Sequence, residues 1–161
     1  MKRTLLTLLL FSPLAFAEEN PMVPLSEFFE KLGNDASAPD MLYVEYRCIG
    51  YYTNLLGLFL ADGSDRTSDV IKDIEMVLET FDGFAWKTWV LIDFVAGKEE
   101  SSYEEYFANL KKSLGEITKN YQIESNNSWN NSGSYFNDYL NNDGAACIEM
   151  TQMLENMFNK K

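Results

Sequence analysis

The sequence contains no histidine, and it has only two cysteines. Without histidine, neither a Ser-His-Asp nor a Cys-His nucleophile system can form, and no zinc or haem can be held by an imidazole. A glycine-rich phosphate-binding loop is also absent from the sequence. What remains for an enzyme is a pair of carboxylates, and among 25 acidic residues the spacing singles out none. The sequence therefore predicts no catalytic residue, no metal ligand and no cofactor.

Basic residues are also scarce. The chain has 13 lysines and arginines against 25 aspartates and glutamates, which gives a net charge of −12 at pH 7. Such a surface repels nucleic acid and anionic lipid, and it attracts basic proteins and cations. Charge kept for solubility alone would give the same composition. We expect no nucleic acid as partner and no stable membrane insertion, and we expect a protein partner of basic character.

The first seventeen residues predict a secretory signal peptide. Lys2 and Arg3 precede an apolar run that reaches Phe16, and small residues stand at Ala15 and Ala17. The run is much shorter than the ~20 residues that span a bilayer, so a membrane anchor is disfavoured. Cleavage after Ala17 would remove two basic and no acidic residues, leaving 11 basic and 25 acidic ones and a net charge of −14. A periplasmic or secreted protein is expected.

The two cysteines predict a disulfide, because an even cysteine count in an exported chain is typical of a bridge. Cys48 and Cys147 each lie on the apolar stripe of a predicted helix. Closing a loop of about 100 residues stabilises a fold by ~4–5 kcal/mol in the chain-entropy description. The bridge would fix the last helix against the helix that holds Cys48.

The stretch from Asp40 to Ala61 predicts a long helix in the middle of a bundle, with Asp40 as its N-cap. Its apolar residues recur at three- and four-residue spacing and cover almost every face. A membrane span is disfavoured because Glu45, Arg47 and Asn54 interrupt the run. Glu45 and Arg47 are the most anomalous polar residues of the chain. We predict a buried polar pair of satisfied partners at the bundle edge, with a functional role as the alternative.

Four other segments show the apolar spacing of helices. In the segment that contains Asp82 and Gly83 the stripe continues without a slip, so we expect one bent helix there rather than two collinear ones. Short connections favour antiparallel neighbours. The predicted helices cover residues 25–32, 68–96, 101–121 and 135–159.

The predicted fold is therefore all-α. We expect a bundle of about four long helices plus one short N-terminal helix, forming a single domain over residues 25–161. Residues 18–24 contain two prolines and should be extended and loosely held.

Aromatic and methionine side chains supply the candidate interaction residues. Rings concentrate between Phe81 and Phe94, where a place in the core is favoured over a ligand patch. Residues 124–134 form a predicted polar loop in which Trp129 stands alone, so its ring either folds back as an anchor or meets a partner. Met153 belongs to a methionine stripe that fits either core filling or an adaptable binding face. The candidates are Trp129, Trp86, Trp89 and Met153.

The run Cys48-Ile49-Gly50-Tyr51-Tyr52 is similar to the cysteine-glycine-tyrosine start of small exported helical immunity proteins that are paired with bacterial secretion toxins. The likeness covers five residues, and the further cysteines of those proteins are missing, so it assigns no residue role here. In composition the chain is also similar to periplasmic acid-stress chaperones.

Together these features favour a binding module over an enzyme. The class includes immunity-, inhibitor- and chaperone-like proteins. The alternatives are a carboxylate-dependent hydrolase or lyase, and a structural subunit of an envelope complex. In a binder, the acidic surface would steer a basic partner and Trp129 would make a final contact.

Overall fold

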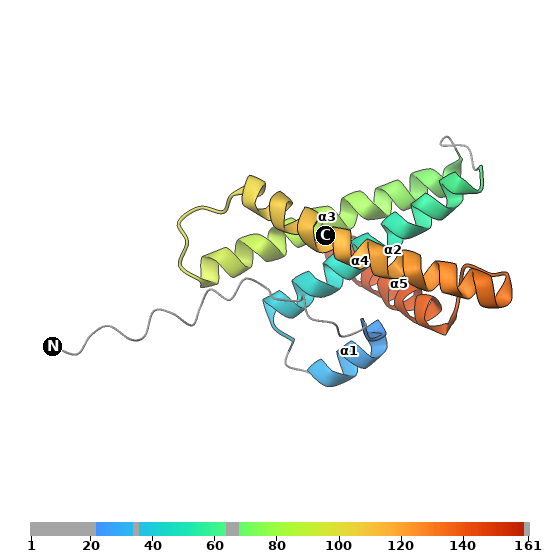
Figure 1. Ribbon diagram of the computed structural model, residues 1–161. Helices are drawn as coiled ribbons and strands as arrows, with labels where there is room; N and C mark the ends of the chain where they lie inside the picture. The colour runs from blue at the N-terminus through green and yellow to red at the C-terminus, as the bar shows by residue number, and fades with distance from the viewer. Residues whose placement is uncertain (1–21, 34–35, 64–67, 160–161) are drawn as a thin grey trace.

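The computed structural model describes residues 22–33, 36–63 and 68–159, with side chains up to Met153. The regular structure of those residues is entirely helical, which confirms the predicted all-α bundle with one disulfide. The predicted signal peptide, with Ala15 and Ala17, lies outside this part of the chain. The helices are α1 (Leu25–Leu32), α2 (Ala38–Ala61), α3 (Asp69–Val95), α4 (Tyr103–Ser132) and α5 (Asp138–Asn159) (Figure 1).

The helix α2 begins two residues earlier than predicted, and Ser37 rather than Asp40 is its N-cap. The Ser37 side chain accepts from the Asp40 backbone N–H, and the Asp40 carboxylate accepts from the Ser37 N–H at 2.9 Å. Pro39 fits into this first turn because the backbone N–H groups there have no partner within the helix.

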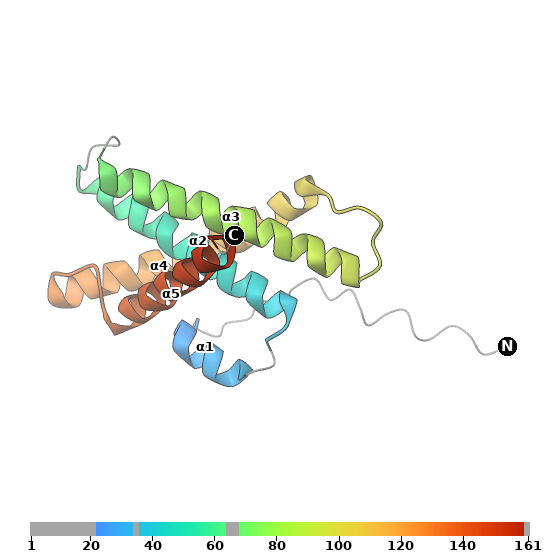
Figure 2. The same cartoon turned by 180° about the vertical axis from the view of Figure 1, so that it is seen from behind.

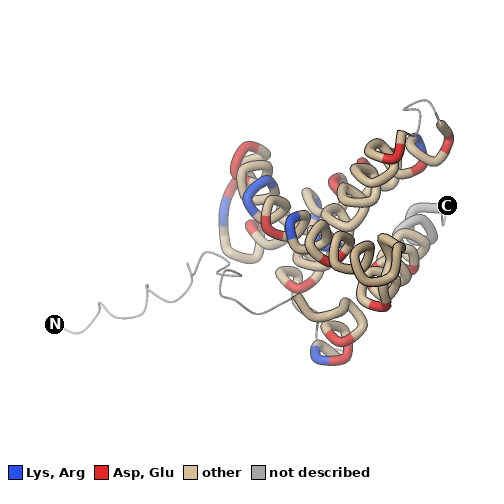
Figure 3. The backbone as a smooth tube through the Cα atoms, turned by 45° about the vertical axis from the view of Figure 1, so that its right-hand side comes forward, with Lys and Arg blue, Asp and Glu red and all other residues tan. Residues whose placement is uncertain are grey.

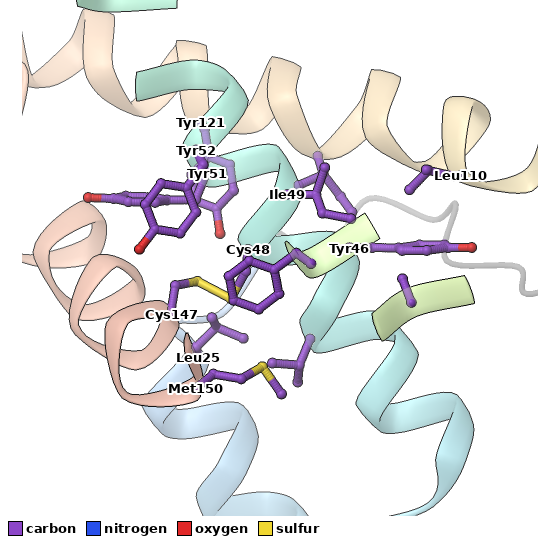
Figure 4. Packing of buried hydrophobic residues seen from close by; sticks show 14 of the residues in the cluster. Leu25, Tyr46, Cys48, Ile49, Tyr51, Tyr52, Leu110, Tyr121, Cys147 and Met150 are labelled. Atoms are coloured by element: carbon purple, nitrogen blue, oxygen red, sulfur yellow. A yellow bond between two sulfur atoms is a disulfide. The ribbon is translucent and has the colours of Figure 1, made fainter. Parts of the chain in front are cut away.

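The helix α2 lies at the centre of the described structure and contacts α3, α4 and α5. Every residue from Val44 to Tyr52 is buried, as expected for a helix that is apolar on most faces. Figures 1 and 2 show α3 lying along α2 in both views. Figure 4 shows the core around Cys48, with side chains of α2, α4 and α5 meeting there. Among the described residues no helix has the length and apolarity needed to cross a membrane.

The helix α3 is continuous across Asp82 and Gly83, so the prediction of one helix is confirmed. Phe81 and Ala85, on either side of these residues, are fully buried. Gly83 faces open space. Core packing of its neighbours therefore holds the helix together where glycine weakens it by ~1 kcal/mol.

Two other glycines allow helices to approach closely. A Cβ atom added to Gly50 on α2 would lie 2.4 Å from Cγ2 of Ile117 on α4. A Cβ atom added to Gly144 on α5 would lie 2.4 Å from the Tyr51 hydroxyl oxygen on α2. Both contacts are shorter than packed atoms allow, so a larger residue at either position would force the neighbouring side chain to shift.

The predicted polar loop over residues 124–134 is wrong, because α4 continues as a helix to Ser132. Two of its serines, Ser125 and Ser128, are buried, and Asn54 of α2 donates to the Ser125 hydroxyl at 3.0 Å. The helix ends at Gly133, which has φ of +72° and donates its N–H to the Trp129 carbonyl. This segment packs through hydrogen-bonded polar groups, and hydrophobic periodicity does not detect such packing.

Candidate functional site

Arg47 of α2 and Asp143 of α5 form an ion pair whose side chains are completely shielded from solvent. The Arg47 Nη2 atom donates to Asp143 and to the Tyr139 hydroxyl, the latter at 2.9 Å. Its Nε donates to the Tyr121 hydroxyl at 3.0 Å, and its Nη1 donates to the Val23 carbonyl at 3.0 Å. Burial alone would lower the pKa of Arg47, but Tyr121 and Asp143 raise it well above its ordinary value, so the guanidinium is charged.

The Asp143 carboxylate is equally well satisfied. Its Oδ1 atom accepts from the Leu25 backbone N–H at 2.7 Å, and its Oδ2 atom accepts from the Tyr121 hydroxyl. Burial raises the pKa of Tyr121 well above its ordinary value, which keeps that hydroxyl a donor. Together with the Val23 contact of Arg47, the Leu25 bond attaches Val23 and the start of α1 to α2 and α5.

The disulfide joins the same two helices close to the ion pair. Cys48 follows Arg47 on α2, and Cys147 lies one turn after Asp143 on α5, with the two Cα atoms 5.4 Å apart (Figure 4). The predicted pairing is therefore confirmed. We call these four residues, Arg47, Cys48, Asp143 and Cys147, the α2–α5 crossing. Because its charged groups are enclosed and paired, we interpret it as the structural centre of the fold.

Glu45 and Arg47 are both buried, but they are not partners of each other. Residues two apart on a helix point to different sides, and Glu45 turns towards α3, where Thr88 Oγ1 donates to its Oε1 at 3.0 Å. Among the described residues, its Oε2 has no hydrogen-bond partner, and neither do the hydroxyl of Tyr46 and Nε1 of Trp89. Burial raises the pKa of Glu45 to about 7, although the Thr88 hydrogen bond opposes the shift.

A carboxyl group that titrates near pH 7 would suit general acid-base catalysis, but it must reach a substrate. Glu45 is 3% exposed, and Asp143 is held in the α2–α5 crossing. In the described part of the chain, no group of three or more histidine, cysteine, aspartate or glutamate residues is arranged to hold a metal ion. The buried acids thus support the fold and provide no open reaction centre.

Large apolar side chains are exposed where α3 ends and α4 begins. Phe94 is 76% exposed and Val95 is 77% exposed on the last turn of α3. Trp86, Val90 and Phe94 follow one another at four-residue spacing along one side of α3. The centroid of the Trp86 ring lies 5.2 Å from that of Tyr103 on α4. We call this the α3–α4 apolar surface; its exposed members are Val90, Leu91, Phe94, Val95, Tyr103 and Phe107.

The prediction of a core position was therefore wrong for Phe94, which is exposed together with Tyr103 and Phe107 at the start of α4. The described structure shows why: the last turns of α3 and the first turns of α4 lie at one end of the molecule, joined by a loop (Figure 1). Periodicity correctly placed these residues on one side of each helix. It could not show that no helix of the described part of the chain packs against this side.

The four predicted interaction residues lie on three helices. Trp86 and Trp89 are half-buried on α3, and each ring packs edge-on against Tyr106 of α4. Trp129 on α4 is 48% exposed and stacks on Tyr135, with ring centroids 4.5 Å apart. Met153 on α5 is exposed. Trp86 is the candidate that borders the α3–α4 apolar surface.

No family model matches this chain, and no curated protein or solved structure is similar to it.

Proposed function

We propose that this protein is a binding module that docks a protein partner through the α3–α4 apolar surface. The observation that carries the proposal is the exposure of Phe94 and Val95, two apolar side chains that are about three-quarters exposed on a regular helix. A contiguous exposed patch of large apolar residues is typical of an interaction site, whereas single exposed residues are common on any protein. Aromatic side chains such as Phe94, Tyr103 and Phe107 are the kind that anchor such contacts.

Export to the periplasm or the extracellular space is part of the proposal. The Cys48–Cys147 disulfide supports it, because disulfides persist in oxidising compartments and are rare in the cytosol. The N-terminal sequence pattern of Lys2, Arg3 and Ala15-Phe16-Ala17 supports it independently.

The alternative of a carboxylate-dependent hydrolase or lyase has less support. An enzyme of that kind needs two carboxyl groups on either side of a bond that a substrate can bring to them. The described structure buries three carboxyl groups, those of Glu45, Asp93 and Asp143, and all three are shielded from solvent. A structural subunit of an envelope complex would use the same apolar surface, and it differs from a binder by staying bound throughout purification.

Affinity capture with matched variants tests the proposal. The exported form of the chain, the Phe94→Ser/Val95→Ser variant and a Met76→Ser control would be immobilised in parallel. Met76 is 58% exposed on the same helix, so its substitution removes a similar exposed group at a position outside the surface. We expect partners retained by the wild type and the control to be lost from the double variant. If the same proteins remain on all three, the α3–α4 apolar surface is not the docking site.

A further inference from the structure

We infer that the partner presents a basic amphipathic segment to the α3–α4 apolar surface, with apolar side chains in the centre and lysine or arginine over the loop that joins α3 to α4. This inference rests on the proposed function, because it specifies the chemistry of what the same surface binds. It comes from the charges that border the apolar residues.

Exposed glutamates surround the loop end of the surface. Glu99 and Glu100 lie in the loop shortly after Val95, and Glu104 follows Tyr103 directly. All three are exposed. Glu104 has a structural explanation, since an acid in the first turn of a helix favours the positive end of its dipole. Glu99 and Glu100 precede the helix and make no interaction with it in the described structure. They are therefore the stronger indication of a basic partner.

The basic residue of this loop is already paired. Lys98 Nζ lies 2.9 Å from Asp93 Oδ1 and 3.5 Å from Glu105 Oε2. The Asp93 hydrogen bond raises the pKa of Lys98 above its ordinary value, although burial opposes this shift. Because Lys98 is neutralised by Asp93 and Glu105, the described residues leave the charges of Glu99, Glu100 and Glu104 uncompensated. We call these three glutamates the acidic rim of the surface.

The opposite end of the surface has a different charge. Lys87 lies one turn before Leu91 on α3, and Lys111 lies one turn after Phe107 on α4. The surface therefore has glutamates at its loop end and lysines at its other end. Acidic residues as such are not special to it, because they occur on every described helix (Figure 3). Basic side chains of the partner should therefore gain most at the loop end, beside Glu99, Glu100 and Glu104.

Membrane binding and pairing with a second copy are less compatible with these charges. An anionic lipid surface would be repelled by a chain of net charge −12, and two copies that met at their loop ends would bring like charges together. A basic protein segment is attracted by the rim and buries its apolar side chains on Phe94, Val95 and their neighbours.

Three synthetic helical peptides would test the inference. They share one face of leucines, and their remaining positions are lysine, glutamine or glutamate. We expect the lysine peptide to bind the wild-type protein roughly tenfold more tightly than the glutamine peptide, and the glutamate peptide to bind most weakly. The lysine advantage should largely disappear between ~0.05 and ~0.5 M salt, where screening shortens to several Å.

Matched variants test whether the acidic rim causes the tighter binding of the lysine peptide. Glu99→Gln/Glu100→Gln/Glu104→Gln should remove the lysine advantage and leave binding of the glutamine peptide unchanged. The control Glu75→Gln/Glu79→Gln/Glu116→Gln neutralises three acids that are also exposed and lie away from the surface, and it should retain the advantage. Phe94→Ser/Val95→Ser should weaken the binding of all three peptides.

The outcomes separate the two proposals. Equal binding of the lysine and glutamine peptides, together with loss of both in Phe94→Ser/Val95→Ser, would overturn the basic partner and leave the docking surface standing. A lysine advantage that the control variant also loses would show general attraction to an acidic protein and would overturn the rim assignment. If no peptide binds, or if none distinguishes the wild type from Phe94→Ser/Val95→Ser, both proposals fail.

Discussion

The α2–α5 crossing buries charged side chains, whereas the α3–α4 apolar surface exposes apolar ones. Both arrangements are the opposite of what is usual in a folded protein. At the crossing, the charged pair Arg47–Asp143 is completely enclosed and every strong donor and acceptor around it has a partner. At the surface, Phe94 and Val95 are left facing solvent. Removing a charge from water costs several kcal/mol unless it is paired, so the crossing makes sense only as part of the fold. An exposed apolar patch does not stabilise the fold, which is why we propose it as a contact with another molecule.

At the crossing, an ion pair and a disulfide together fix the position of α5 along α2. Arg47 and Cys48 are neighbours on α2, and their partners Asp143 and Cys147 are one turn apart on α5. A slip of α5 along α2 would break both contacts. We interpret the ion pair as a device for this register, since a buried ion pair is weak support for stability by itself. The following predictions separate the crossing from the surface, in order of decreasing effect on stability.

Removing the disulfide should have the largest effect. We expect Cys48→Ser/Cys147→Ser to lower the free energy of unfolding by ~4–5 kcal/mol, because the unfolded chain regains the freedom of a loop of about 100 residues. Urea denaturation of the oxidised wild type and the variant measures the difference. A loss below ~1 kcal/mol would show that the hydrogen-bonded groups alone fix the crossing.

Breaking the Arg47–Asp143 ion pair should lower the free energy of unfolding by a similar amount. Asp143→Ala leaves the Arg47 guanidinium buried and unpaired and frees the Leu25 N–H, so we expect a loss of ~3–5 kcal/mol. Glu149→Ala, an exposed position on the same helix, is the control and should change stability by less than ~0.5 kcal/mol. Similar losses in the two variants would contradict a special role for Asp143.

Glu45 should make stability depend on pH. Its pKa is raised from 4.5 to about 7 in the folded chain, so the folded state binds more protons than the unfolded state between these values. This contribution is fully present below pH 4.5 and is lost as pH rises through 7, by an amount on the order of 3 kcal/mol. Glu45→Gln should stabilise the protein at pH 8 relative to the wild type and have little effect at pH 4.5. Urea denaturation at both pH values tests this, and an equal change at both would refute the titration of Glu45.

Two glycine substitutions should have opposite signs. Gly50→Ala places a Cβ atom against Ile117, and we expect it to lower stability by ~1–3 kcal/mol. Gly83→Ala meets open space on a continuous helix, so higher helix propensity should raise stability by up to ~1 kcal/mol. Thermal unfolding followed by circular dichroism compares the two variants. Destabilisation by both would mean that α3 needs the bend that Gly83 permits.

The smallest effects on stability are expected at the exposed aromatic positions. Phe94→Ser/Val95→Ser should change the free energy of unfolding by less than ~1 kcal/mol while removing partner binding. Trp129→Ala loses a stacking contact with Tyr135, so it should lower stability by about 1 kcal/mol. If Trp129→Ala also weakens capture of the partner, the ring is a second contact. A drop of many degrees in melting temperature with unchanged capture would instead make it a core anchor.

The sequence alone determined the all-α fold, the core of each helix and the disulfide. The predicted segment 25–32 coincides with α1, the stripe across Asp82 and Gly83 is one helix, and Cys48 is bridged to Cys147. These features follow from spacing along the chain and from the parity of a rare residue, and both can be read without knowing which helices meet. Arg47 and Glu45 were also recognisable as anomalies, because they interrupt an otherwise apolar run.

The tertiary structure decided which partners those residues have. Arg47 and Asp143 are 96 positions apart, and no local pattern links them. The extension of α4 beyond Tyr121 depends on Ser125 meeting Asn54, a polar contact that hydrophobic spacing does not reveal. The same limit applies to the candidate site. Spacing places Phe94 and Phe107 on the apolar sides of their helices, but only the packing of α3 and α4 leaves those sides open to solvent, since burial depends on a neighbour that the sequence does not name.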